Sequence, residues 1–129
     1  MSPSSFLSHA YKLISTDEAC RSCVITDPNQ PDNPITYVTA DFEKQTGYKA
    51  EEVIGRNCRF LQGPETNPNT VNEIRQALEV GEPVKVKILN YTRNGNPFWN
   101  TLSIRPSFDE NSKIRAFVAV QMITLPETG

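Results

Sequence analysis

Residues 55–65 read GRNCRFLQGPE and gather side chains that could do chemistry. An amide, a thiol, a guanidinium and a second amide stand within six positions: Asn57, Cys58, Arg59 and Gln62. A guanidinium binds anions through charge-assisted hydrogen bonds, and a thiol is a nucleophile once it is activated. In a short helix Cys58 shares a face with Leu61 and Gln62, because they follow it by three and four positions. The stretch is therefore predicted to be a helical wall of a ligand pocket.

Three amides interrupt apolar rows on three predicted strands. They are Asn90, Asn100 and Gln121, which continue or break the rows of residues 84–88, 98–104 and 117–123. A buried amide without a partner costs about 1–3 kcal/mol, and a single one is usually a satisfied core residue. Three on successive strands indicate one polar patch on the sheet, suited to a flat heterocycle edged with donors and acceptors.

Arg75 stands on the apolar face of a predicted helix, in the same row as Val71, Ile74 and Leu78. It either extends its charged head to solvent from the edge of that face or meets an anion at the rim of the pocket. In the second reading Arg59 and Arg75 together hold an anionic tail. The ligand inferred from these residues is a planar, polar-edged ring on a phosphate-bearing chain, with one thiol against the ring.

The predicted order of strands and helices along the chain indicates which elements carry these candidate site residues. Strands are predicted at 23–27, 35–39, 85–92, 98–105 and 113–123. Helices are predicted from an Asp41 cap to Gly47, from the acidic pair 51–52, and from Asn67-Pro68 to Val80 before Gly81. This order predicts an α+β domain, a five-stranded antiparallel sheet with helices packed on one face.

Composition limits the function classes. The chain has 129 residues, a formal net charge of −2 and no apolar run of membrane-spanning length. Neither nucleic acid nor a membrane is an expected partner. Three cysteines, an odd number, indicate free thiols in a reducing compartment, and we expect a cytoplasmic location.

The segment GRNCRFLQGPE closely resembles the signature of LOV (light-oxygen-voltage) domains, the flavin-binding branch of the PAS fold. VITDPNQPDNPITYV, ILNYTRNGNPFWN and FVAVQ lie at family-like spacing, so the resemblance covers residues 22–123. It is strongest to phototropin-type domains. It implies a PAS fold and a blue-light photoreceptor domain, not an enzyme.

The resemblance also implies the role of each site residue. Cys58 matches the thiol that bonds reversibly to flavin C(4a) after illumination, and Gln121 matches the amide that reorients when the flavin N(5) gains a proton. The implied contacts to the flavin are Val24, Thr26, Asn57, Arg59, Leu61, Gln62, Val71, Ile74, Arg75, Asn90, Asn100, Leu102, Phe117 and Gln121. The short connection between Gln62 and the long helix favours FMN, with FAD or riboflavin as alternatives. Ala119 stands where many relatives have glycine, and Cys23 where many have a large apolar residue.

Three segments are expected along the chain. Residues 1–21 form a flanking segment with a short amphipathic helix at 6–14, residues 22–124 form the core, and LPETG at 125–129 resembles an appended sortase tag. The signal is expected to travel through the sheet to the flanking segments, with an effector domain or partner absent from this chain. The amphipathic segment packs on the sheet or pairs two copies, and we favour a homodimer through it or through the sheet face.

Other functions remain as alternatives. The main one is a PAS-type module that binds flavin or another ligand without covalent photochemistry. A zinc site would use Cys20, Cys23, Cys58 and His9. Cysteine-nucleophile catalysis would pair Cys58 with His9, the only histidine of the chain.

Overall fold

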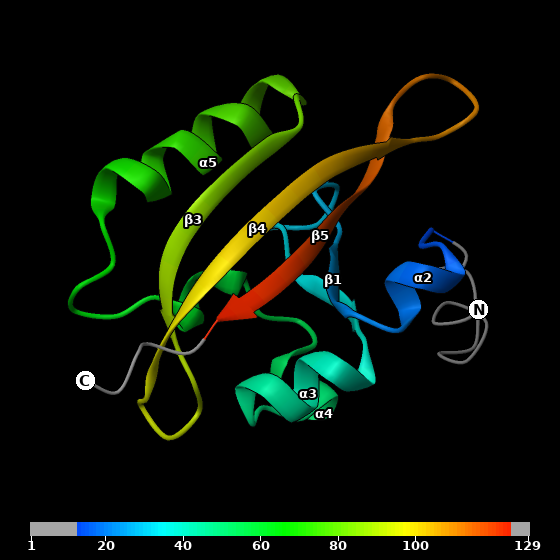
Figure 1. Ribbon diagram of the computed structural model, residues 1–129. Coiled ribbons are helices and arrows are strands. Elements are labelled where there is room, and N and C mark those ends of the chain that lie inside the picture. The colour runs from blue at the N-terminus through cyan, green and yellow to red at the C-terminus, as the bar shows by residue number, and fades with distance from the viewer. Residues whose placement is uncertain (1–12, 125–129) are drawn as a thin grey trace.

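The structure is a computed structural model that describes residues 13–124, and its centre is a five-stranded antiparallel sheet (Figure 1). The strands are β1 (Ser22–Thr26), β2 (Ile35–Val38), β3 (Val84–Tyr91), β4 (Pro97–Phe108) and β5 (Ile114–Thr124). Their order is β2-β1-β5-β4-β3, so the first and last strands of the chain pair in the middle of the sheet. The predicted sheet is confirmed, although β4 runs three residues beyond its predicted end.

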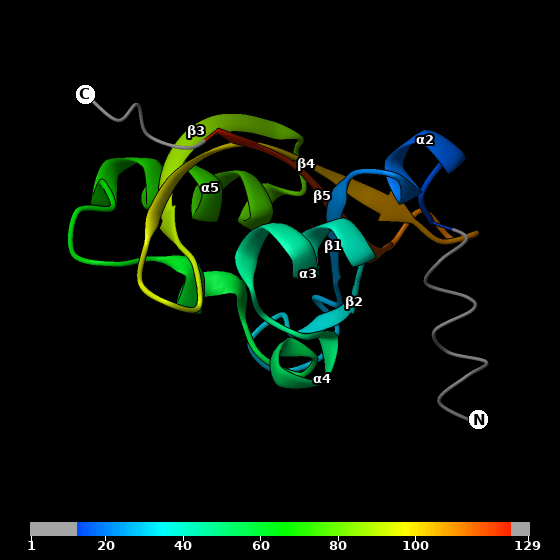
Figure 2. The same ribbon diagram turned by 60° about the horizontal axis from the view of Figure 1, so that its bottom comes forward.

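Three α-helices and one 3-10 helix lie beneath the concave face of the sheet (Figure 2). They are α3 (Ala40–Thr46), α4 (Ala50–Val53), the 3-10 helix η1 (Cys58–Leu61) and α5 (Pro68–Val80). One buried apolar cluster between the sheet and α3, α4 and η1 consists of Val24, Ile35, Val38, Phe42, Val53 and Leu61. Helices and sheet thus bury one shared apolar layer, as the strand and helix order predicts.

Local sequence explains where the helices begin and end. α5 starts at Pro68, whose missing N–H is not needed there, and the Asn67 side chain accepts from the backbone N–H of Asn69. α3 and α5 end at Gly47 and Gly81, which adopt left-handed φ values of 81° and 71°. These boundaries confirm the prediction.

The predicted Asp41 cap was wrong. Thr39 is the N-cap of α3, and Asp41 lies inside the first turn. There its negative charge interacts favourably with the positive end of the helix dipole. Its carboxylate also accepts a hydrogen bond from the Gln45 side chain at 3.0 Å.

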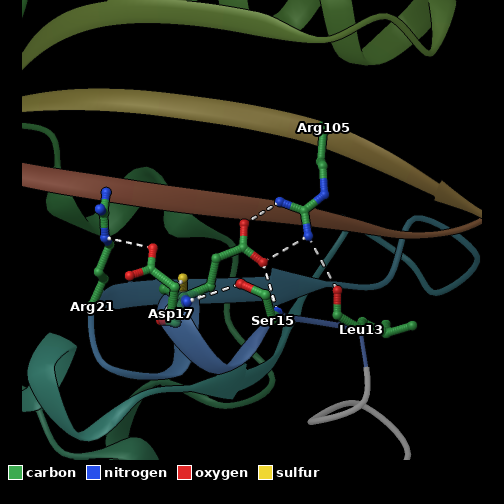
Figure 3. Close-up of polar contacts among 7 residues, drawn as sticks. Leu13, Ser15, Asp17, Arg21 and Arg105 are labelled. Carbon is green, nitrogen blue, oxygen red and sulfur yellow. Dashed lines mark hydrogen bonds and ion pairs between the residues drawn. The ribbon is translucent and has the colours of Figure 1, made fainter.

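The opposite face of the sheet carries a short helix that the sequence did not predict, α2 (Thr16–Ala19). Glu18 and Ser15 form a capping box there, and Arg105 of β4 forms an ion pair with the Glu18 carboxylate. Figure 3 shows Arg105 reaching from β4 towards Ser15 and Leu13, whose carbonyl accepts from the guanidinium at 3.2 Å. The Arg105 hydrogen bond lowers the pKa of Glu18, so the ion pair between α2 and β4 persists to a lower pH than an unpaired glutamate would allow.

A second apolar cluster lies under this segment. Leu13 and Ile14 pack, with Tyr37, against the buried residues Ile25, Ala116 and Val118. The expected helix at 6–14 falls mostly, and the expected tag at 125–129 entirely, outside the described residues. Between residues 13 and 124 no helix is long and apolar enough to cross a membrane.

Candidate functional site

A cavity lies between the sheet and the segment formed by η1 and α5. Thirteen predicted site residues line it: Val24, Thr26, Asn57, Cys58, Arg59, Leu61, Gln62, Ile74, Asn90, Asn100, Leu102, Phe117 and Gln121. The other two, Val71 and Arg75, line a more open groove that adjoins the cavity and shares Asn57, Arg59 and Gln62 with it. The structure thus places every predicted site residue in the cavity or in the groove that adjoins it.

The three predicted amides form the polar wall of the cavity. Asn100 Nδ2 donates to Asn90 Oδ1 at 3.0 Å, and Ser22 Oγ donates to Gln121 Oε1 at 3.0 Å. Asn100 Oδ1 is buried and has no hydrogen-bond partner within the described chain. Such an acceptor costs free energy until something donates to it, and an N–H on the edge of a ligand would satisfy it.

Cys58 lies on the facing wall. It opens η1, whose first turn is fixed by the Asn57 side chain accepting from Arg59 N at 2.9 Å. The surrounding protein withdraws the thiol from bulk water, and this burial raises the pKa of Cys58 to about 12. The sulfur is therefore a protonated thiol at neutral pH, which disfavours its use as an ordinary thiolate nucleophile.

The groove carries the two predicted cations. Arg59 lies beside Asp32, with its Nη1 at 3.0 Å and 2.9 Å from the two carboxylate oxygens. Arg75 donates to the Asn72 side chain within α5. Both guanidiniums are exposed at the mouth of the cavity, where a charged tail would leave it.

Several lining residues were not among the predicted site residues: Asn33, Leu78, Ile88, Ile104 and Ala119 in the cavity, and Pro28, Asp32 and Glu79 in the groove. Ile88 lies two positions before Asn90 and Ile104 four positions after Asn100, so each shares a strand face with its amide and the strand period could have found them. Asn33 has no such signal. Its Oδ1 is buried without a partner in the part of the chain that the structure describes, and its place depends on the path of the loop between β1 and β2.

The alternative roles of the thiols gain no structural support. Within residues 13–124 no three His, Cys, Asp or Glu side chains gather as a metal site would require. Cys23 is buried in β1, where burial raises the pKa of its thiol to about 11, whereas Cys20 is exposed. His9, which the zinc and catalytic alternatives require, lies outside the described residues.

The sequence profile of the PAS domain family matches residues 21–122. A LOV domain from a blue-light-activated histidine kinase of Erythrobacter litoralis has a similar solved structure, with a TM-score of 0.80 and 41% sequence identity. The match covers 83% of this chain and 98% of that domain. The chain is a LOV domain of the PAS family. The resemblance seen in the GRNCRFLQGPE segment is thereby confirmed.

Curated relatives of this LOV domain are longer proteins. A blue-light-activated histidine kinase of Brucella anthropi is 48% identical over 106 residues, which is 82% of this chain and 22% of that protein. Phototropin-2 of Oryza sativa subsp. japonica is 44% identical over 102 residues, 79% of this chain and 11% of that protein. The LOV domain thus spans about a fifth or less of these relatives and belongs to a family of blue-light photoreceptors.

LOV domains bind flavin, and the residues that line the cavity fit that group. The isoalloxazine ring carries an N–H between two carbonyls on one edge, which matches the open acceptor Asn100 Oδ1 and the amides beside it. Apolar residues such as Leu61 and Phe117 can cover the faces of the ring.

Proposed function

We propose that this domain is a blue-light switch that binds FMN non-covalently in the dark and bonds Cys58 Sγ reversibly to the flavin C(4a) carbon on illumination. The observation that carries this proposal is the meeting, in one cavity, of a half-buried, protonated thiol and an amide wall with an open acceptor. No substrate is turned over, so the domain acts as a sensor and not as an enzyme.

The proposed binding roles follow the chemistry of each wall. Asn90, Asn100 and Gln121 hold the polar edge of the ring, while Arg59 and Arg75 bind the terminal phosphate in the groove. FMN is proposed over FAD because the link from η1 to α5 is short and leaves little chain to cover a second nucleotide.

When bound, the flavin supplies light absorption and the electrophilic carbon. Cys58 would supply the sulfur of the new bond and its Sγ proton, which would pass to the ring nitrogen N(5), so that no external base would be needed. The Gln121 amide, which carries one donor and one acceptor, would then turn to present its oxygen to the protonated edge of the ring.

The signal is proposed to leave the cavity through Ser22. Its hydroxyl donates to Gln121 Oε1, and the two residues are paired across β1 and β5. A hydroxyl can also accept a hydrogen bond, so Ser22 can follow the amide when it turns. Ser22 is the first residue of β1 and follows α2 closely in the chain. The altered hydrogen bond therefore affects the segment that the Glu18–Arg105 ion pair attaches to β4.

We expect Ser22→Ala to leave light-induced bleaching of the flavin band intact but to weaken the response of residues 13–21. The loss of this buried hydrogen bond leaves Gln121 Oε1 without a donor and lowers the free energy of unfolding by about 1–3 kcal/mol. Hydrogen exchange of the backbone amides in darkness and under blue light measures the response. Ser22→Thr, which keeps the hydroxyl, should restore it, and an undiminished response in Ser22→Ala would contradict the proposed route.

The decisive experiment for the function is an absorption spectrum of the purified protein before and after a blue flash. We expect a structured flavin band that bleaches to a single near-ultraviolet peak and recovers in darkness. A flavin band that never bleaches would instead support the passive PAS-type binder. The absence of any flavin band, even after addition of FMN, would refute the proposal.

The remaining features of the domain are also proposals. Residues 22–124 are proposed as the sensing core, residues 1–21 as a flanking output segment and 125–129 as an appended tag. An effector would receive the signal from the flanking segments, in a cytoplasmic protein that pairs as a homodimer. Light scattering of the full chain tests the oligomeric state.

A further inference from the structure

The groove at the cavity mouth holds an acidic residue against one of its two cations. Both carboxylate oxygens of Asp32 contact the guanidinium of Arg59, two of these contacts being 2.9 Å and 3.0 Å long. This bidentate arrangement is the one through which arginine also grips a phosphate. Asp32 therefore occupies the part of Arg59 that an anionic ligand would use.

The backbone holds Asp32 in this place. Asp32 and Asn33 both adopt left-handed conformations, with φ values of 68° and 48°. The Asn57 side chain donates to the Asp32 carbonyl at 2.7 Å while it caps η1. The loop is thus tied to the residue preceding Cys58, so the carboxylate stays near the mouth even when Arg59 turns to another anion.

We propose that Asp32 is a specificity-determining residue whose carboxylate competes with the terminal phosphate of the flavin for Arg59. The inference rests on the proposed function, since it assumes that the groove receives this phosphate. A phosphate entering the groove must replace an ion pair and then lie beside a fixed negative charge. Asp32 consequently narrows the preference of the site for FMN over riboflavin, which lacks the phosphate.

The ion pair between Arg59 and Asp32 is exposed to solvent, which limits how much Asp32 can weaken FMN binding. The side chains of Arg59 and Asp32 are 55% and 62% exposed, so solvent and salt screen their attraction. Relief from this competition is therefore expected to favour FMN by about two- to fivefold at low salt, and by less as the salt concentration rises.

The test is the affinity of the full chain, freed of flavin, for FMN and for riboflavin, measured by the change in flavin fluorescence on binding. Asparagine tolerates the left-handed backbone of position 32 and keeps its carbonyl, so Asp32→Asn changes mainly the charge. We expect the ratio of the riboflavin Kd to the FMN Kd to rise about two- to fivefold, with the riboflavin Kd unchanged. A ratio that falls would mean that Asp32 orients Arg59 for the phosphate, and a ratio within twofold of the wild type would equally overturn the proposal.

Two controls isolate the contact. Glu79→Gln removes another exposed carboxylate of the same groove and should change the ratio by less than the Asp32 variant. In an Arg59→Ala background, Asp32→Asn should lose its gain; if the gain persists, the effect is one of general charge and the proposal fails. A wild-type chain that binds neither flavin would refute the proposed function itself, whereas bleaching with an unchanged ratio in Asp32→Asn would refute only the role of Asp32.

Discussion

Cys58→Ala is expected to abolish light-induced bleaching completely while the protein still binds flavin and fluoresces under continuous blue light. The sulfur is the only group that we assign to bond formation, and alanine removes it without adding bulk to the cavity. The groups proposed to bind the ring edge and the phosphate are other side chains, namely the amides on the sheet and the guanidiniums of Arg59 and Arg75, and the substitution leaves them in place. The measurement is the visible spectrum and the fluorescence yield before and after illumination.

The matched control for this variant is Cys20→Ala, which removes an exposed thiol outside the cavity. It should bleach and recover as the unmodified chain does. Bleaching that survives in Cys58→Ala would show that the sulfur has been assigned to the wrong residue.

Gly63→Ala is expected to be the most disruptive single-methyl addition near the site. A Cβ at position 63 would lie 2.2 Å and 2.3 Å from two ring carbons of Tyr91. The ring would have to move, and its hydroxyl would lose the hydrogen bond from Glu65 N, now 3.1 Å long. We expect a loss of about 1–3 kcal/mol in the free energy of unfolding, together with weaker flavin binding because Gln62 precedes the altered position.

Chemical denaturation and flavin titration measure these two losses. The double variant Gly63→Ala with Tyr91→Ala makes room for the methyl group. If the clash is the cause, the stability losses of the two single variants should not be additive. The double variant should then lose less free energy of unfolding than the sum of the two single losses. Additive losses would mean that Gly63 is required for another reason.

The sequence predicts the parts of this site that repeat with a regular period. Asn90, Asn100 and Gln121 stand out because each falls on an apolar face of period two, where an amide is costly. Gly47 and Gly81 mark helix ends for an equally local reason. Short-range rules therefore sufficed for the sheet, the long helix and the amide wall.

Other features depend on contacts that no local rule contains. α2 has four residues, which are too few to show a helical period. The ion pair that attaches it to β4 joins Glu18 to Arg105, which are 87 positions apart in the sequence. The pairing of Asp32 with Arg59 depends on two loop residues with left-handed backbone conformations. Neither of them is a glycine, so the sequence gives no sign of this conformation. The need for Gly63 appears only when Tyr91 of β3 is placed against it. The roles of the site residues stay predictions until flavin binding is measured.

The strand order has a consequence for biosynthesis. β1 takes its central place only when β5 arrives, and the bonded residues Ser22 and Gln121 are 99 positions apart. Until β5 is made, β1 has an open edge, although all five of its residues are buried in the finished fold. The sheet can therefore close only after β5 has been made, so folding of the domain waits for a long-range contact, and until then the open edge of β1 can pair with other chains.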